Sequence, residues 1–336
     1  MKKLLTLILV IGSSTAFGQQ SNNFSMAQSS LSLLNPAATA VMYPEFRFFG
    51  NYRGQYFSDP LIPNRTNSFV FETKIAKDKL PNGWFGSGLH FVNDETNVDG
   101  TKLIGIQAYV PINYVAEVSP DTYFSVGFKP GIINRSLQTD FQTWDNQWNG
   151  IAFNRFEDPN EPAQADFTVF DMSAGIYFQT ETRKEHRFNI GVTGNHLTSP
   201  DVTFTGIADN LYRQWVGHAR ASFKLERVRF RLSPEATAFV QGPLTYYQSG
   251  MSLDFMIREG SRRTTFRQDQ TLGIGLHYRS DNTLVSTIIL QLEGFEIGFA
   301  YDLDLGESST ATGGNAGMEA FLRFGILKEK RKRFIR

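Results

Sequence analysis

GFEIGFAYDL, residues 294–303, alternates between large apolar side chains and polar or small ones. Phe295, Ile297 and Phe299 share one parity, whereas Glu296 and Asp302 fall on the other. Successive side chains of a β-strand point to opposite faces, so this stretch predicts a sheet with one apolar face and one polar face. Two architectures fit: a soluble sandwich with the apolar face inward, and a membrane barrel with that face toward lipid.

The N-terminal residues predict that the chain is exported. Residues 1–18 have Lys2 and Lys3, an apolar run over residues 4–11, and small residues on both sides of Phe17, which is typical of a signal peptide. The sequence contains no cysteine, which excludes a disulfide framework. Beyond residue 18, no apolar run approaches the roughly 18 residues of a transmembrane helix.

Alternation continues along the chain and predicts about fourteen antiparallel strands, an even number that is typical of bacterial outer-membrane barrels. The expected strands lie near residues 46–55, 68–76, 84–93, 102–113, 122–131, 167–178, 187–196, 215–224, 227–234, 246–257, 271–279, 283–292, 295–303 and 317–327. The longer connections mostly follow odd-numbered strands, which favours periplasmic termini. We therefore expect an all-β transmembrane barrel over residues 45–327 in the outer membrane, with lipid around it. A soluble sandwich would have too few polar outward faces for 30 Phe residues.

Residues 19–44 are expected to form a plug-like segment inside the barrel. SLSLLNPAATAV, residues 30–41, is too apolar for a free tail, and Pro36 would end any helix over residues 26–34. Several charged side chains should also point into the lumen: Arg47, Arg53, Glu72, Arg229 and Arg231. If the plug and paired charges fill the lumen, a scaffold is favoured; an open apolar cavity would favour a channel or a transporter of hydrophobic solutes.

Aromatic residues concentrate in the expected outer loops. The long connection FQTWDNQWNGIAFNRFEDPNEPAQAD, residues 141–166, mixes aromatic side chains with Asp, Asn and Gln. Long loops are usually functional, and exposed aromatic side chains often anchor protein partners. The candidate partner-binding residues are Trp144, Trp148, Phe153, Phe156, Tyr212 and Trp215. An equally weighted alternative is a loop that packs on its own aromatic side chains.

The sequence predicts no catalytic site, no metal site and no cofactor. His196 precedes Ser199 by three residues, but no acidic residue is placed beside them as a catalytic triad requires. Lys plus Arg and Asp plus Glu both number 33, so the formal net charge is zero and no nucleic-acid partner is expected. We therefore expect a protein that is not an enzyme.

Five blocks in fixed order carry a family resemblance: NPAATA (35–40), NYRGQY (51–56), GNHLTSP (194–200), RLSPEA (231–236) and AYDLDLGESSTATGGNAGMEAFLRF (300–324). Together they resemble the PorP/SprF family, outer-membrane proteins of the type IX secretion and gliding machinery of Bacteroidota. The residues that match its motifs are Asn35, Pro36, Ala37, Tyr52, Arg53, Gln55, His196, Leu197, Pro200, Tyr301, Asp302, Gly314 and Glu319. Tyr56 stands where the family usually has Trp.

The resemblance implies a non-enzymatic barrel, related in shape to fatty-acid transporters, that supports secretion or surface anchoring of a cargo protein. Such a cargo would carry a type IX C-terminal sorting domain, as large adhesins do. The resemblance also implies a periplasmic partner that binds peptidoglycan or belongs to the motor complex. A basic periplasmic tail at residues 328–336 extends beyond the last strand and could contact an acidic partner, or simply be a solvated end. Its cationic residues are Lys328, Lys330, Arg331, Lys332 and Arg333.

Overall fold

The computed structural model describes residues 24–42, 44–55, 64–77, 79–98, 101–138, 147–154, 166–204, 209–225, 228–259, 269–306 and 309–326. The predicted signal peptide, Trp144, Phe156 and the basic tail lie outside these residues.

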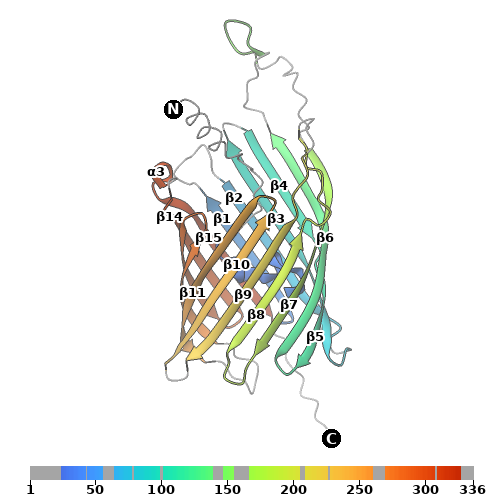
Figure 1. The fold of residues 1–336 in the computed structure, drawn as a ribbon, viewed down its shortest axis with the longest axis vertical. Helices are drawn as coiled ribbons and strands as arrows, with labels where there is room; N and C mark the ends of the chain where they lie inside the picture. Colours follow the sequence, from blue (N-terminus) through green and yellow to red (C-terminus); the bar gives the residue numbers. More distant parts are fainter. Residues whose placement is uncertain are drawn as a thin grey trace, which may run out of the picture.

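The described residues form one closed antiparallel barrel (Figure 1). Its strands are β1 (Phe46–Gln55), β2 (Asn64–Ile75), β3 (Gly83–Val98), β4 (Thr101–Tyr109), β5 (Ile112–Ser119), β6 (Thr122–Gln138), β7 (Asp166–Glu181), β8 (Arg187–Asn195), β9 (Gln214–Leu225), β10 (Phe230–Gln241), β11 (Leu244–Arg258), β12 (Gln270–Arg279), β13 (Thr283–Leu292), β14 (Phe295–Asp304) and β15 (Asn315–Ile326). β1 pairs with β15, which closes the sheet. The short helix α3 (Ser309–Thr312) lies in the connection between β14 and β15.

The wall has fourteen strand positions because β4 and β5 occupy one of them. Both segments pair with β3 and β6 in a continuous register, and Val110 and Pro111 separate them. Pro111 has no N–H to give to the ladder, and Pro130 lies across from Val110 on β6 and accepts its N–H at 3.0 Å. The predicted number of strands and the fold class are confirmed.

The two ends of the barrel differ in their connections. The end reached by β1 has the two longest, at residues 139–165 and 196–213, whereas the start of β1 and the end of β15 share the opposite end. Long loops lie outside the cell in bacterial barrels, so the first end is the outer end and the second the periplasmic end. An eleven-residue periplasmic connection, residues 259–269, remains the exception to the length pattern.

Side chains alternate across the wall as the sequence predicts. On β14, Phe295, Ile297 and Phe299 are 44–51% exposed on the outer surface, whereas Glu296 and Asp302 are buried toward the lumen. β15 follows the same rule, with Leu322 exposed and Glu319 1% exposed. The exposed apolar band therefore faces lipid, and the polar face lines the lumen.

This assignment predicts a depth-dependent cost for a charge on the outer surface. Phe299→Arg, at the middle of β14, should destabilise the inserted barrel by about 2–4 kcal/mol, because arginine then meets hydrocarbon. Leu305→Arg is the matched control, since Leu305 is 58% exposed just beyond the outer end of β14, and it should cost about 0–1 kcal/mol. Chemical denaturation of the purified barrel in lipid vesicles measures both, and equal costs would contradict the assignment.

Two strands run further than the sequence predicts. The residues expected as a turn at 114–121 belong mostly to β5, and the chain reverses tightly at Pro120 and Asp121. The outer connection expected at 235–245 is a turn of only Gly242 and Pro243, because β10 continues to Gln241. Arg229 was expected in the lumen; that prediction is wrong, because it lies exposed in the turn before β10.

Residues 24–42, here called the plug, fold inside the barrel, where Figure 1 shows them in blue behind the strands. The plug contains two short 3-10 helices, η1 (Ala27–Ser30) and η2 (Pro36–Ala38), and one helical turn, α2 (Leu31–Leu34). The helical run ends at Asn35, which is extended as residues before proline usually are. Plug residues Met26, Ala27, Leu34 and Ala37 pack in three apolar clusters against different parts of the wall.

Candidate functional site

The strongest candidate site is the contact between the plug and the wall. Asn35 is fully buried and makes three polar contacts. Its Oδ1 accepts from the N–H of Ala37 at 2.9 Å, its Nδ2 donates to the carbonyl of Ile176 at 2.8 Å, and Nδ2 lies 3.2 Å from Nε2 of His218. The same side chain therefore shapes the NPA turn and attaches it to β7 and β9.

The carbonyl groups after Asn35 are held by side chains of β3, β5 and β6. Asn113 donates from Nδ2 to the carbonyls of Ala37 and Thr39, both at 2.8 Å. Ser125 donates to the Ala37 carbonyl, and the indole N–H of Trp84 donates to the carbonyl of Ala40 at 3.1 Å. Buried backbone groups of the plug thus find hydrogen-bond partners on the wall, which a segment without regular pairing requires.

Glycines on the facing strands make room for this turn. A Cβ at Gly127 would lie 2.8 Å from the nitrogen of Ala37, and one at Gly86 would lie 2.7 Å from the carbonyl oxygen of Thr39. A Cβ at Gly175 or Gly191 would contact the side-chain amide of Asn35. The absence of a side chain at these positions lets the plug backbone approach the sheet directly.

The beginning of the plug is held by a buried cluster of charges. Glu319 accepts from the backbone N–H groups of Ser25 and Met26 at 2.6 and 3.1 Å, and from Nδ2 of Asn51 at 3.0 Å. Asp302 accepts from the hydroxyl of Ser25 at 2.6 Å and pairs with Arg279 at 2.6 Å and Arg53 at 3.3 Å. These carboxylates belong to β14 and β15, at the far end of the chain from the plug.

Other charged residues of the lumen are paired as well. Arg47 pairs with Glu72, and Arg231 pairs with Asp269 at 2.9 Å. Arg323 donates to the carbonyl of Ser29 at 2.9 Å and pairs with Glu296. Apart from Arg229, the predicted inward charges therefore form ion pairs on the lumen face of the wall. Within the described ranges, no group of three or more His, Asp or Glu side chains is placed to hold a metal ion.

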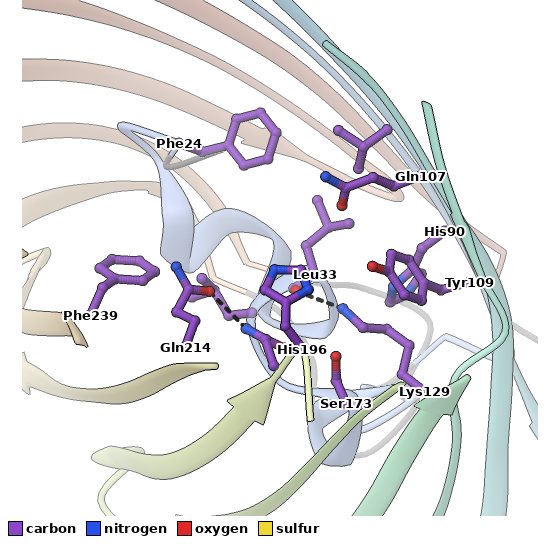
Figure 2. Close-up of a pocket in the computed structure, with 13 residues that line it drawn as sticks. Phe24, Leu33, His90, Gln107, Tyr109, Lys129, Ser173, His196, Gln214 and Phe239 are labelled. Atoms are coloured by element: carbon purple, nitrogen blue, oxygen red, sulfur yellow. Dashed lines mark hydrogen bonds between the residues drawn. The ribbon is translucent and has the colours of Figure 1, made fainter. Parts of the chain in front are cut away.

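A cavity of about 70 Å³ lies on the outer side of the plug (Figure 2). Beside it, Asp171 on β7 accepts from the Tyr109 hydroxyl at 2.7 Å and the Thr198 hydroxyl at 3.1 Å, and contacts Nδ1 of His196 at 2.8 Å. His196 has a positive φ of 55° where the outer connection 196–213 begins. The ring of His196 is thus bound to a carboxylate, and its imidazole makes no hydrogen bond to a described serine hydroxyl.

The candidate partner-binding aromatic residues separate into two places. Trp148 and Phe153 form a bridge in a small hairpin, residues 147–154, with ring centroids 4.9 Å apart and each side chain 48% exposed. Figure 1 shows this hairpin beyond the strand ends, on the same side as α3. Tyr212 and Trp215 instead border a cleft of about 410 Å³ on the outside of the wall, at the outer end of β9 and β10.

The family-motif residues are brought together around the plug more closely than the sequence indicated. Asn35, Pro36 and Ala37 form the NPA turn. Asp302 and Glu319 hold the beginning of the plug at Ser25, and Arg53 pairs with Asp302. His196 joins the cluster around Asp171, whereas Gly314 closes the loop beside α3 by accepting the N–H of Asp304. Tyr52 and Leu197 are not part of these contacts. Sequence reasoning missed Asn113, Ser125, Asp171 and Lys129, whose only signal was the inward parity of their strands.

One solved structure supports the fold class. The chain resembles the TodX deltaS2S3 mutant monoaromatic hydrocarbon channel with a TM-score of 0.51 and 9% identity, over 91% of this chain and 95% of that one. The Pseudomonas putida toluene transporter TodX is 8% identical, with a TM-score of 0.44 over 90% and 93% of the two chains. An outer membrane channel from Pseudomonas putida F1 is 10% identical, with a TM-score of 0.40 over 85% and 96%. At these identities the likeness concerns the fold alone.

Fold and lumen together define an outer-membrane β-barrel that carries its own N-terminal plug. The family model for the type IX secretion system membrane protein PorP/SprF matches residues 16–322, and the chain belongs to this family. Membership connects it with the membrane and with type IX secretion. Curated protein sequences give no match.

Proposed function

We propose that this barrel is a plugged scaffold that holds a type IX cargo protein at the cell surface through its outer loops, and that it is not an enzyme. The plugged lumen is the observation that carries the proposal. A conducting pore or a solute path needs open space along the axis, whereas here the plug is bonded to β3, β5, β6, β7, β9 and β15. A periplasmic partner of the secretion machinery would contact the opposite end.

The hairpin 147–154 supports the loop-binding part of the proposal. Asn149 Oδ1 accepts from the N–H groups of Ile151 and Ala152, both at 2.9 Å, and Gly150 has a φ of 91°, so the tip has a defined turn. Ile151 at this tip is 88% exposed, and it lies between Trp148 and Phe153 in the sequence. The paired rings, with an exposed apolar side chain at the same tip, form an anchor of the kind that protein interfaces bury.

Replacing Trp148 and Phe153 with Ala should reduce the cargo displayed on the cell surface about tenfold or more. Buried aromatic anchors contribute about 2 kcal/mol or more each to protein interfaces, so the loss of two weakens cargo binding by well over tenfold. The measurement is surface labelling of the cargo in native cells, after affinity purification of the tagged barrel has identified the cargo among the co-purified proteins.

The matched control is Val118→Ser, at a position 67% exposed at the periplasmic end of β5. It should leave surface cargo unchanged, while all variants insert at equal levels in the outer membrane. Wild-type display by the double variant would refute the role of the hairpin. A barrel that purifies alone with a bound solute would instead favour the channel or transporter function.

A further inference from the structure

The cavity on the outer side of the plug is lined by both polar and apolar side chains. Figure 2 shows Lys129, His90, Tyr109 and Gln107 on one side, and Phe24, Phe239 and Gln214 on the other. Leu33 and Leu34 of the plug also line it, so the plug supplies part of the apolar surface. Its volume of about 70 Å³ exceeds the space that one water molecule needs, roughly 10–15 Å³ on this measure.

Lys129 is a buried cation without an ion-pair partner among the described residues. Its Nζ donates to the carbonyl of Leu33 at 3.3 Å and lies 4.8 Å from the ring centroid of Tyr109. Asp171 acts on Lys129 electrostatically but forms no ion pair with it, and is held by Tyr109, His196 and Thr198. Burial of a charge is costly unless it is paired, so an anion beside Lys129 would be stabilised.

His90 supplies a second, independent observation. It is 2% exposed and lines the same cavity, yet neither of its ring nitrogens has a hydrogen-bond partner in the described part of the chain. Buried polar groups in folded proteins are nearly always hydrogen-bonded, so an unpartnered imidazole beside a cavity points to a water molecule or a ligand in that cavity. The ring nitrogens can donate to an oxygen anion next to Lys129.

From this geometry we infer that the cavity binds a small carboxylate with a short aliphatic tail. The carboxylate oxygens accept from the ammonium group of Lys129 and from His90, and the tail lies against Leu33, Leu34 and Phe239. A bare inorganic anion leaves Leu33, Leu34 and Phe239 without contacts, and a neutral solute brings no charge to pair with Lys129. The plug backbone takes part through the Leu33 carbonyl, so the ligand and the plug share Lys129.

The test is saturation-transfer NMR of sodium butyrate with the purified full-length barrel in deuterated detergent. The butyrate methyl signal should show transfer, and butyramide, the neutral isostere, should show little. Lys129→Met should raise the Kd for butyrate about tenfold, because a charge-assisted hydrogen bond is lost while the side-chain volume is kept. Lys102→Met is the control, because Lys102 pairs with Glu95 on the outer part of the wall, and it should bind as wild type does.

Equal transfer to butyrate and butyramide would overturn the inference, and so would a Lys129→Met variant that binds butyrate as tightly as wild type. Folding is checked by heat-modifiable migration in gel electrophoresis. If Lys129→Met does not fold, His90→Leu takes its place with the same expected loss. Competition by sodium phosphate that matches competition by butyrate itself would show a general anion site. It would refute the role of the apolar side chains Leu33, Leu34 and Phe239.

Discussion

Deletion of residues 24–42 is expected to turn a closed barrel into an open pore. The plug provides the groups that cross the lumen, and a wall of fourteen strands without a plug encloses an aqueous channel. Ion conductance in planar bilayers should rise at least about tenfold over wild type. Asp302 keeps its pairs with Arg53 and Arg279 in this variant, so the wall should still close.

The control for this deletion removes residues 147–154 instead. That hairpin lies beyond the strand ends, so its loss should leave conductance at the wild-type level (Figure 1). Both variants are compared after confirming heat-modifiable migration. A plug deletion that inserts correctly and conducts no more than wild type would show that the wall side chains alone block the lumen.

Gly127→Val should displace the plug from the wall. Even the first carbon of the new side chain would lie 2.8 Å from the nitrogen of Ala37 and 2.9 Å from its Cα, and backbone atoms cannot turn away as a flexible side chain can. Overpacking of this kind costs about 1–3 kcal/mol or more. The chain has no cysteine, so Ser32→Cys, at a fully buried plug position, reports release through maleimide labelling. Maleimide labelling of the Ser32→Cys protein should therefore be about tenfold faster when the protein also carries Gly127→Val.

Gly105→Val is the matched control, also on the lumen face of the wall. A Cβ at Gly105 would meet only Cβ of Asp94, at 3.9 Å, which is an ordinary contact. This variant should label as slowly as the parent Ser32→Cys protein. Slow labelling of both glycine variants would mean that the NPA turn adjusts to the new side chain while the plug stays bound to the wall.

The strand number and the two faces of the wall followed from alternation, because lipid and lumen impose opposite polarity on successive residues. Phe295 is exposed on the outer surface and its neighbour Glu296 is buried toward the lumen, as this rule requires. Strand ends were harder to predict, because they depend on pairing with the neighbouring strands, which the sequence of a single segment does not reveal. The strand expected near residues 227–234 continues past Pro234 to Gln241, because pairing with β11 is kept throughout.

The plug was predictable as a segment but its contacts were not. Pro36 and the apolar residues before it indicated a compact piece, whereas the partners of Asn35 on β7 and β9 are set by the curvature of the closed wall. Gly86 makes room for the plug backbone at Thr39, which nothing in its own strand indicates. Ile151 escaped notice because one aliphatic residue in a polar loop has no periodicity to mark it.

The bond between Ser25 and Glu319 has a consequence for the order of assembly. It joins residues 294 positions apart, and Glu319 reaches its place only when β15 pairs with β1. The plug, which is synthesised before any strand of the wall, can therefore reach its final position only after the last strand has paired. Contacts so distant in sequence form slowly, since the intervening chain must be ordered first. Closure of the wall and completion of its interior are accordingly one late event in folding.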